Sequence, residues 1–137
     1  MSGNRLTARE TAAALRGMDN VLILTHVRPD GDTIGCAAAL CQALRDMGKT
    51  AYLLYNPEIT ATYAPCAAPY WAPEGWEPSF VVSVDIAALS LLPENAKAYA
   101  GCIDLAVDHH PSQEFFAAET CLEAESAACG EIIYEII

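Results

Sequence analysis

The hydrophobic residues of this chain form two kinds of pattern that alternate along it: short continuous apolar runs and longer stretches with helical spacing. Val21–Leu24 is a short, continuously apolar run, which is typical of a strand buried on both faces of a parallel sheet. From Ile34 to Met47 the apolar residues recur at every third or fourth position, and Gly48 then supplies a helix stop. The pattern therefore predicts a buried strand followed by a helix.

The same two patterns recur along the rest of the chain. Further strands are expected at 51–55, 80–84 and 103–107. A first helix is expected from Thr7, where Thr7-Ala-Arg-Glu10 matches a capping box, to about Arg16, and a last helix over 124–137. Strands that alternate with helices predict an α/β domain with a doubly wound, mainly parallel sheet and helices on both faces.

The segment 56–78 shows neither the strand pattern nor the helix pattern, and it is rich in proline and aromatic residues. A connection of this length is often functional, and Trp71 and Trp76 could form a lid that stacks on a base. The alternative is that its aromatic side chains cover one edge of the sheet. Both interpretations stay open at this point.

Composition narrows the class of protein. The chain has 137 residues, the length of one domain, and 7 Lys plus Arg against 18 Asp plus Glu give a formal charge of −11. This balance argues against a partner such as long double-stranded nucleic acid, which is bound through many cationic side chains. No apolar run is long enough to span a membrane. Six cysteines without a C-x-x-C pair, and no secretory segment, predict reduced thiols and a cytoplasmic location.

Three of the predicted strands run directly into side chains that bind metals or protons. These residues are His26, Asp30 and Asp32 after the first, Asp85 after the third, and Asp108, His109 and His110 after the fourth. In an open parallel sheet the carboxyl ends of the strands line one crevice, where ligands bind at the point at which the winding reverses. We therefore expect these side chains to converge.

Aspartate and histidine without cysteine suit Mn²⁺ or Mg²⁺ better than a structural zinc ion. We expect Asp30 and Asp32 to lie on a short turn, because Pro29 fixes its own φ and Gly31 tolerates a positive φ. The two carboxylates could then diverge toward two ions, with Asp85 bridging them. Two ions that share a carboxylate are typical of phosphoester hydrolysis.

The last two residues of this group have different expected roles. His110, beside a ligating His109, is placed to contact a phosphate or to protonate the leaving oxygen. Asp108 would orient the two imidazoles without binding the ions itself. His110 and Asp108 are therefore the candidate catalytic residues.

Other interpretations of these segments are weaker. Asp-Gly-Asp alone is usually a turn. An EF-hand is excluded because Ile34 and Cys41 stand where acidic ligands belong. An aspartate nucleophile of the haloacid-dehalogenase type would follow its strand directly, whereas Asp30 is six residues past Leu24. The spacing of the glycines fits neither common phosphate-binding loop.

Taken together, these residues resemble the DHH phosphoesterase family. The similar segments are His26 to Gly35, Val81 to Asp85, and Val107 to Pro111 with the triplet Asp108-His109-His110, in the order and spacing of the family's first three motifs. The resemblance covers nearly the whole chain. The segment Glu125 to Glu135 is similar to that of the bifunctional nanoRNases that also dephosphorylate 3′-phosphoadenosine 5′-phosphate.

The resemblance implies a ligand set for two Mn²⁺ ions. His26, Asp30 and Asp85 would hold one ion, Asp32, Asp85 and His109 the other, and His110 would face the substrate phosphate. The sequence departs from the family at Cys36, where Ser or Ala is common. The family's fourth motif and its C-terminal domain would fall beyond Ile137, so we expect residues 1–137 to be a truncated DHH domain with the C-terminal domain absent.

The function that the resemblance implies is hydrolysis of short oligonucleotides or nucleoside bisphosphates. A family II pyrophosphatase, a RecJ-type exonuclease, or a non-catalytic fragment with an incomplete metal site are the alternatives. A domain without its second half would expose apolar surface, which predicts a homo-oligomer.

Overall fold

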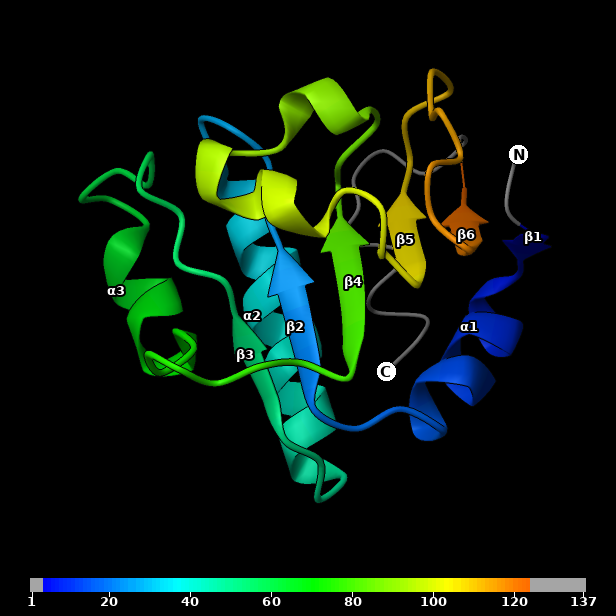
Figure 1. Cartoon of the computed structure of the whole chain (residues 1–137), viewed down its shortest axis with the longest axis horizontal. Helices are drawn as coiled ribbons and strands as arrows, with labels where there is room; N and C mark the ends of the chain where they lie inside the picture. The colour runs from blue at the N-terminus through cyan, green and yellow to red at the C-terminus, as the bar shows by residue number, and fades with distance from the viewer. Residues whose placement is uncertain (1–3, 124–137) are drawn as a thin grey trace.

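A single parallel sheet forms the centre of the computed structural model, which describes residues 4–123 (Figure 1). Its six strands lie in the order β1-β6-β5-β4-β2-β3, and every neighbouring pair is parallel. The strands are β1 (Asn4–Leu6), β2 (Val21–Leu24), β3 (Ala51–Leu53), β4 (Phe80–Val84), β5 (Leu105–Asp108) and β6 (Glu119–Leu122).

The winding of the sheet reverses between β2 and β4. The chain passes from β2 to β3 on one side, and then crosses to β4, β5 and β6 on the other side. This topology confirms the predicted doubly wound α/β fold, and it places the switch point between the carboxyl ends of β2 and β4.

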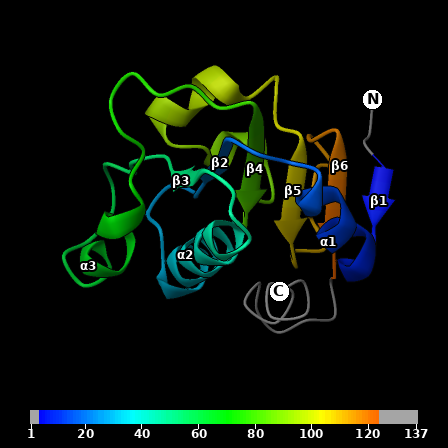
Figure 2. The same cartoon turned by 90° about the horizontal axis from the view of Figure 1, so that it is seen from below.

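Helices cover both faces of this sheet, but unequally (Figure 2). On one face pack α1 (Ala8–Arg16) and α2 (Gly31–Asp46), and on the other pack the short 3₁₀ helices η2 (Leu89–Leu91) and η3 (Glu94–Tyr99). Two further short helices, α3 (Ala64–Ala67) and η1 (Ala68–Tyr70), lie in the proline-rich segment. Within the described part of the chain, no helix has the length and apolar character needed to cross a bilayer.

The continuous apolar run of β2 is explained by burial on both of its faces. Val21 and Ile23 pack in the core that α2 covers, whereas Leu22 and Leu24 pack in the core beneath η3. None of the four is more than 1% exposed. A strand in this position cannot carry the polar alternation of a half-exposed strand.

Several predicted boundaries are wrong by a few residues. Helix α2 begins at Gly31 rather than at Ile34, the predicted strand 51–55 ends at Leu53, and the predicted strand 103–107 covers 105–108. The predicted capping box of α1 is confirmed, since the side chains of Thr7 and Glu10 each accept a hydrogen bond from the other's backbone N–H. The predicted helix over 124–137 lies outside the described residues.

Strands β1 and β6 were not predicted. Both are short, and the paired residues Asn4 and Glu119 are polar, so neither strand forms an apolar run. Their pairing joins segments that are far apart in the sequence, since β1 lies near the start of the described residues and β6 near their end. The two strands are therefore stabilised by their place in the sheet and not by local strand propensity.

The aromatic residues of segment 56–78 cover the edge of the sheet at β3. The ring of Trp71 contacts Tyr55 edge-on with centroids 5.1 Å apart, and Trp76 contacts Tyr52 in the same way at 4.9 Å. The Arg45 guanidinium lies over the ring of Tyr52, 5.1 Å from its centroid. These contacts match the edge-covering interpretation, while a lid function stays a prediction.

Candidate metal centre

Imidazole and carboxylate groups meet at the carboxyl ends of β2, β4 and β5. His26 lies two residues past β2, Asp85 directly follows β4, and His109 directly follows β5. The Asp85 Oδ2 atom is 3.6 Å from His26 Nε2, and its Oδ1 atom is 3.1 Å from His109 Nε2. The structure thus brings the three strand ends together around one carboxylate.

Asp85 belongs to two sets of side chains that could each hold a metal ion. One set is His26, Asp30 and Asp85, and the other is Asp85, Asp108, His109 and His110. In each set the ligand atoms lie within 4.8 Å of one another. Asp85 is the residue that the two sets share, as a bridging carboxylate would be.

The N-terminus of α2 positions Asp30. Its Oδ1 atom accepts a hydrogen bond from the Thr33 backbone N–H at 3.0 Å, which makes Asp30 the N-cap of the helix. The Thr33 hydroxyl donates to the carbonyl of Val84 at 3.2 Å, so the first turn of α2 is attached to the last residue of β4. As a result Asp30 Oδ1 lies 4.0 Å from His26 Nε2.

The predicted short turn around Gly31 is wrong. Gly31 is the first residue of α2, and it is not among the residues with positive φ. Glycine is favoured here for a different reason, because a Cβ atom at this position would lie 3.3 Å from the Tyr63 ring. Close packing by the proline-rich segment, rather than backbone freedom, therefore favours glycine between the two aspartates.

Asp32 lies in the first turn of α2 and approaches the second imidazole. Its Oδ2 atom is 3.8 Å from His109 Nε2. The Cys36 thiol, one turn further along the helix, donates to Asp32 Oδ1 at 3.4 Å. The thiol thereby helps to hold the carboxylate toward His109, while the Asp32 side chain stays 26% exposed.

The backbone of Asp85 adopts a conformation that is rare for a residue with a side chain. Its φ of 62° lies in the left-handed region, and its N–H donates to Val107 O at 2.8 Å. Such a conformation costs on the order of 1–3 kcal/mol and is concentrated at functional sites. Asp85 is only 3% exposed, and its Oδ1 atom has no hydrogen-bond donor among the described residues.

The tautomer of His26 leaves its neutral ring with an acceptor atom that faces the Asp85 carboxylate. Its Nδ1 atom is 2.6 Å from Val27 O, and because a carbonyl can only accept, Nδ1 carries the proton. In the neutral imidazole Nε2 is then an acceptor that faces Asp85, which is also an acceptor. The Asp85 carboxylate accordingly raises the pKa of His26. A hard divalent cation between these atoms satisfies both, so the donor set fits Mn²⁺ or Mg²⁺.

His110 is held by Asp108 rather than by the other ligands. Its Nδ1 atom lies 2.6 Å from Asp108 Oδ1, an oxygen that also accepts from the His109 backbone N–H at 2.8 Å. Asp108 is fully buried, whereas the His110 side chain is 39% exposed. The contact between Asp108 and His110 is the one that an orienting role for Asp108 requires, and the roles of the two residues stay predictions.

Two buried amides near the site were not predicted. Asn56 Nδ2 donates to Thr25 Oγ1 at 2.9 Å and to His26 O at 2.8 Å, and so holds the loop after β2. Gln113 donates to Asp108 Oδ2 at 2.7 Å. An asparagine after a strand and a glutamine after a proline read as ordinary loop residues, so no local signal marks either one.

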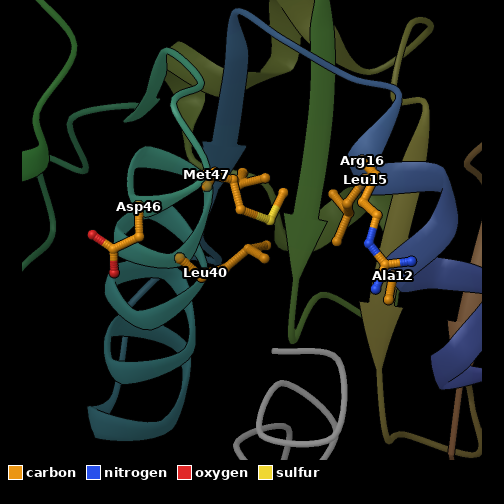
Figure 3. Close-up of a pocket in the computed structure, with 8 residues that line it drawn as sticks. Ala12, Leu15, Arg16, Leu40, Asp46 and Met47 are labelled. Carbon is orange, nitrogen blue, oxygen red and sulfur yellow. The ribbon is translucent and has the colours of Figure 1, made fainter.

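A cavity of about 400 Å³ between α1 and α2 lies away from this cluster (Figure 3). Its lining is mostly apolar, with Leu15 and Leu40 on facing helices and Met47 at the far end of α2 from Asp30. It contains none of the candidate ligands, and its lining is unsuited to phosphate chemistry.

Fold and site together define a doubly wound α/β domain with a candidate metal centre at its switch point. Residues 20–137 match the DHH family, N-terminal domain. The chain belongs to this family, as the resemblance of its motifs indicated.

Two known proteins illustrate the relationship. Over 143 residues the chain is 26% identical to the bifunctional oligoribonuclease and PAP phosphatase NrnA of Thermus thermophilus, with 94% of this chain and 40% of the relative covered. The crystal structure of an exopolyphosphatase-related protein from Bacteroides fragilis superposes with a TM-score of 0.79 at 20% identity, covering 95% of this chain and 42% of that one. The chain spans about two fifths of the length of each.

Proposed function

We propose that this protein is a Mn²⁺-dependent phosphoesterase that hydrolyses short oligonucleotides or nucleoside bisphosphates, with Mg²⁺ as a possible substitute. The observation that supports this most strongly is the buried Asp85 carboxylate, which lies between His26 Nε2 and His109 Nε2. The family membership and the activity named for the Thermus relative support the same reaction class.

His26, Asp30 and Asp85 would hold one ion, and Asp32, Asp85 and His109 the other. When bound, the two ions would supply Lewis-acid activation of a water molecule and charge stabilisation of the phosphoryl oxygens. The chain's own contribution is to hold these ligands at fixed positions, through the strand ends and the first turn of α2. Residues 1–137 would form the catalytic domain.

His110 would act on the proton of the leaving group. Because Asp108 accepts from Nδ1 at 2.6 Å, the Nε2 atom of His110 is the one left to meet substrate. The buried Asp108 carboxylate holds the ring through Nδ1, and a protonated His110 would give its Nε2 proton to the leaving oxygen. Asp108 itself keeps its role as an acceptor throughout.

The charge of the chain favours a small substrate. With a formal charge of −11 the protein repels an extended polyanion, whereas a dinucleotide or a nucleoside bisphosphate places its phosphate on the metal ions. A short nucleotide is therefore the expected partner.

The test is release of mononucleotide from a dinucleotide, and of phosphate from 3′-phosphoadenosine 5′-phosphate, with and without Mn²⁺. We expect Asp85→Asn to abolish both, and the control Asp46→Asn, at the far end of α2, to leave both unchanged. Retention of full activity by Asp85→Asn would contradict the proposal.

The same assay separates the alternatives. Faster turnover of pyrophosphate would favour a pyrophosphatase, and progressive degradation of single-stranded DNA would favour an exonuclease. Calorimetry with Mn²⁺ tests for an inert fragment, since two sites of comparable affinity indicate a working centre and one weak site indicates an incomplete one.

A further inference from the structure

The Gln113 side chain makes three hydrogen bonds beside the candidate metal centre, and these use both of its amide protons. Its Nε2 atom donates to Asp108 Oδ2 at 2.7 Å and to Ile86 O at 2.9 Å, and its Oε1 atom accepts from Phe115 N at 2.9 Å. The residue is 6% exposed. The reversed amide would put Oε1 against two acceptor oxygens, so this orientation is the one that the surroundings allow.

Gln113 connects two of the strand ends that build the site. Ile86 directly follows Asp85, and Asp108 is the last residue of β5. The neighbouring Glu114 N–H donates to Ala87 O at 2.9 Å, so this segment runs along the residues that follow Asp85. The amide thus fixes Asp108 relative to the chain that carries the central carboxylate.

The contacts of Gln113 determine what Asp108 can do. Both Nε2 protons are donated, so the Asp108 oxygen that meets Gln113 must accept. The other Asp108 oxygen accepts from the His109 backbone N–H. Both Asp108 oxygens thus accept hydrogen bonds, which favours His110 Nδ1 as the donor in the 2.6 Å contact with Asp108 Oδ1.

We propose that Gln113 is a positioning residue, which holds Asp108 as an acceptor and thereby keeps neutral His110 in the Nδ1–H tautomer with Nε2 toward the substrate. Its effect on turnover rests on the proposed function, whereas its effect on the tautomer does not. The competing interpretation is that Gln113 only fastens the loop after β5 to the sheet. If Gln113 positions Asp108, removing the Gln113 amide changes the tautomer of His110. If Gln113 only fastens the loop, the tautomer of His110 stays the same.

The tautomer of His110 is measured in the metal-free protein by long-range ¹H–¹⁵N correlation of the imidazoles, at a mildly alkaline pH where they are neutral. We expect the Nδ1–H form in the unsubstituted protein and a substantial Nε2–H population in Gln113→Met. Gln42→Met is the matched control, because Gln42 Nε2 also donates to an aspartate, Asp46, but at the other end of α2. An unchanged tautomer in a folded Gln113→Met protein overturns the proposal.

A second measurement does not depend on the folding of that variant. In the unsubstituted protein the Gln113 side-chain amide protons should exchange with solvent at least about tenfold more slowly than those of exposed Gln42, because buried bonded groups exchange only on local opening. Equal exchange rates for the two amides would contradict the buried arrangement, and with it the proposal.

Turnover of the dinucleotide provides the third readout. General acid catalysis contributes about 10²–10⁴-fold to a reaction rate, and the orientation of His110 accounts for part of this contribution. We therefore expect Gln113→Met to lower kcat roughly tenfold and to change KM by less than about twofold. In a His110→Ala background the same substitution should cause no further loss. An equal loss in both backgrounds indicates a merely structural role. A lack of Mn²⁺-dependent turnover in the unsubstituted protein counts against the proposed function, while the tautomer still decides the role of Gln113.

Discussion

Asp85 Oδ1 and His109 Nε2 lie 3.1 Å apart, although 23 residues separate them along the chain. The pairing of Val84 with Val107 in the parallel register of β4 and β5 causes this proximity, since each site residue follows its strand closely. The sheet thus sets where the buried Asp85 lies relative to His109. Substitutions that change the charge of Asp85 should therefore change stability and metal binding, even when the side chain keeps its size.

Asp85→Asn should stabilise the metal-free protein and remove its response to Mn²⁺. The carboxylate is buried beside His26 Nε2, which is an acceptor in the neutral imidazole, so an uncharged amide of the same size should relieve on the order of 1 kcal/mol at a pH where His26 is neutral. The measurement is urea unfolding with and without Mn²⁺. A less stable Asp85→Asn protein without metal would show that the cluster is not strained.

Mn²⁺ should stabilise the folded protein in proportion to its affinity. Because an ion that binds only the folded state adds RT ln(1 + [L]/Kd), a concentration of about 100 Kd should add about 2.7 kcal/mol. The thermal transition should rise with added Mn²⁺ and return to its starting value after addition of a chelator. Absence of a shift at millimolar Mn²⁺ would mean that the cluster does not bind this ion.

Two substitutions at Asp30 should separate its capping role from its metal-binding role. Asn is as good an N-cap as Asp, so Asp30→Asn should keep the unfolding free energy while weakening Mn²⁺ binding. Asp30→Ala removes the cap as well, and should cost about 1 kcal/mol. Unfolding curves and Mn²⁺ calorimetry on the same two proteins measure both effects. Equal affinity for Mn²⁺ in all three proteins would remove Asp30 from the ligand set.

Gly31→Ala and Gly35→Ala should differ in stability although both lie in α2. A Cβ at Gly35 meets nothing within 4 Å, so Gly35→Ala should gain up to about 1 kcal/mol of helix stability. A Cβ at Gly31 lies 3.3 Å from the Tyr63 ring, so that ring must shift and the gain should be smaller or reversed. Thermal unfolding of the two variants makes the comparison, and adding Tyr63→Ala should restore the gain at Gly31.

Alkaline conditions should destabilise the protein through Cys41. Burial raises the pKa of this thiol from 9.0 to about 11, so the folded state favours the protonated form. The stabilisation is complete below pH 9.0 and is lost as the pH rises through about 11. Urea unfolding across this range should show a steeper loss for the unsubstituted protein than for Cys41→Ala. Parallel pH profiles for the two proteins would contradict this prediction.

Much of the fold followed from local patterns. The short apolar run of β2 and the helical period of α2 are local properties, because burial on two faces and burial on one face require different spacings of apolar residues. The order of strands and motifs then located His26, Asp85 and His109 just past strand ends, and Asp30 and Asp32 where the next helix begins. The conformation around Gly31 was not predictable in this way, because it depends on Tyr63, which lies 32 residues away along the chain.

The sequence by itself thus determined strands β2, β3, β4 and β5, helices α1 and α2, and the polar side chains that follow the strands, since each depends on the order of residues along one segment. Only the tertiary structure decided which of those side chains touch. The register between β4 and β5 sets Asp85 beside His109, and the loop after β5 returns Gln113 to Asp108. Hydrogen bonds between distant segments have no period in the sequence, so they become visible only when the chain has folded.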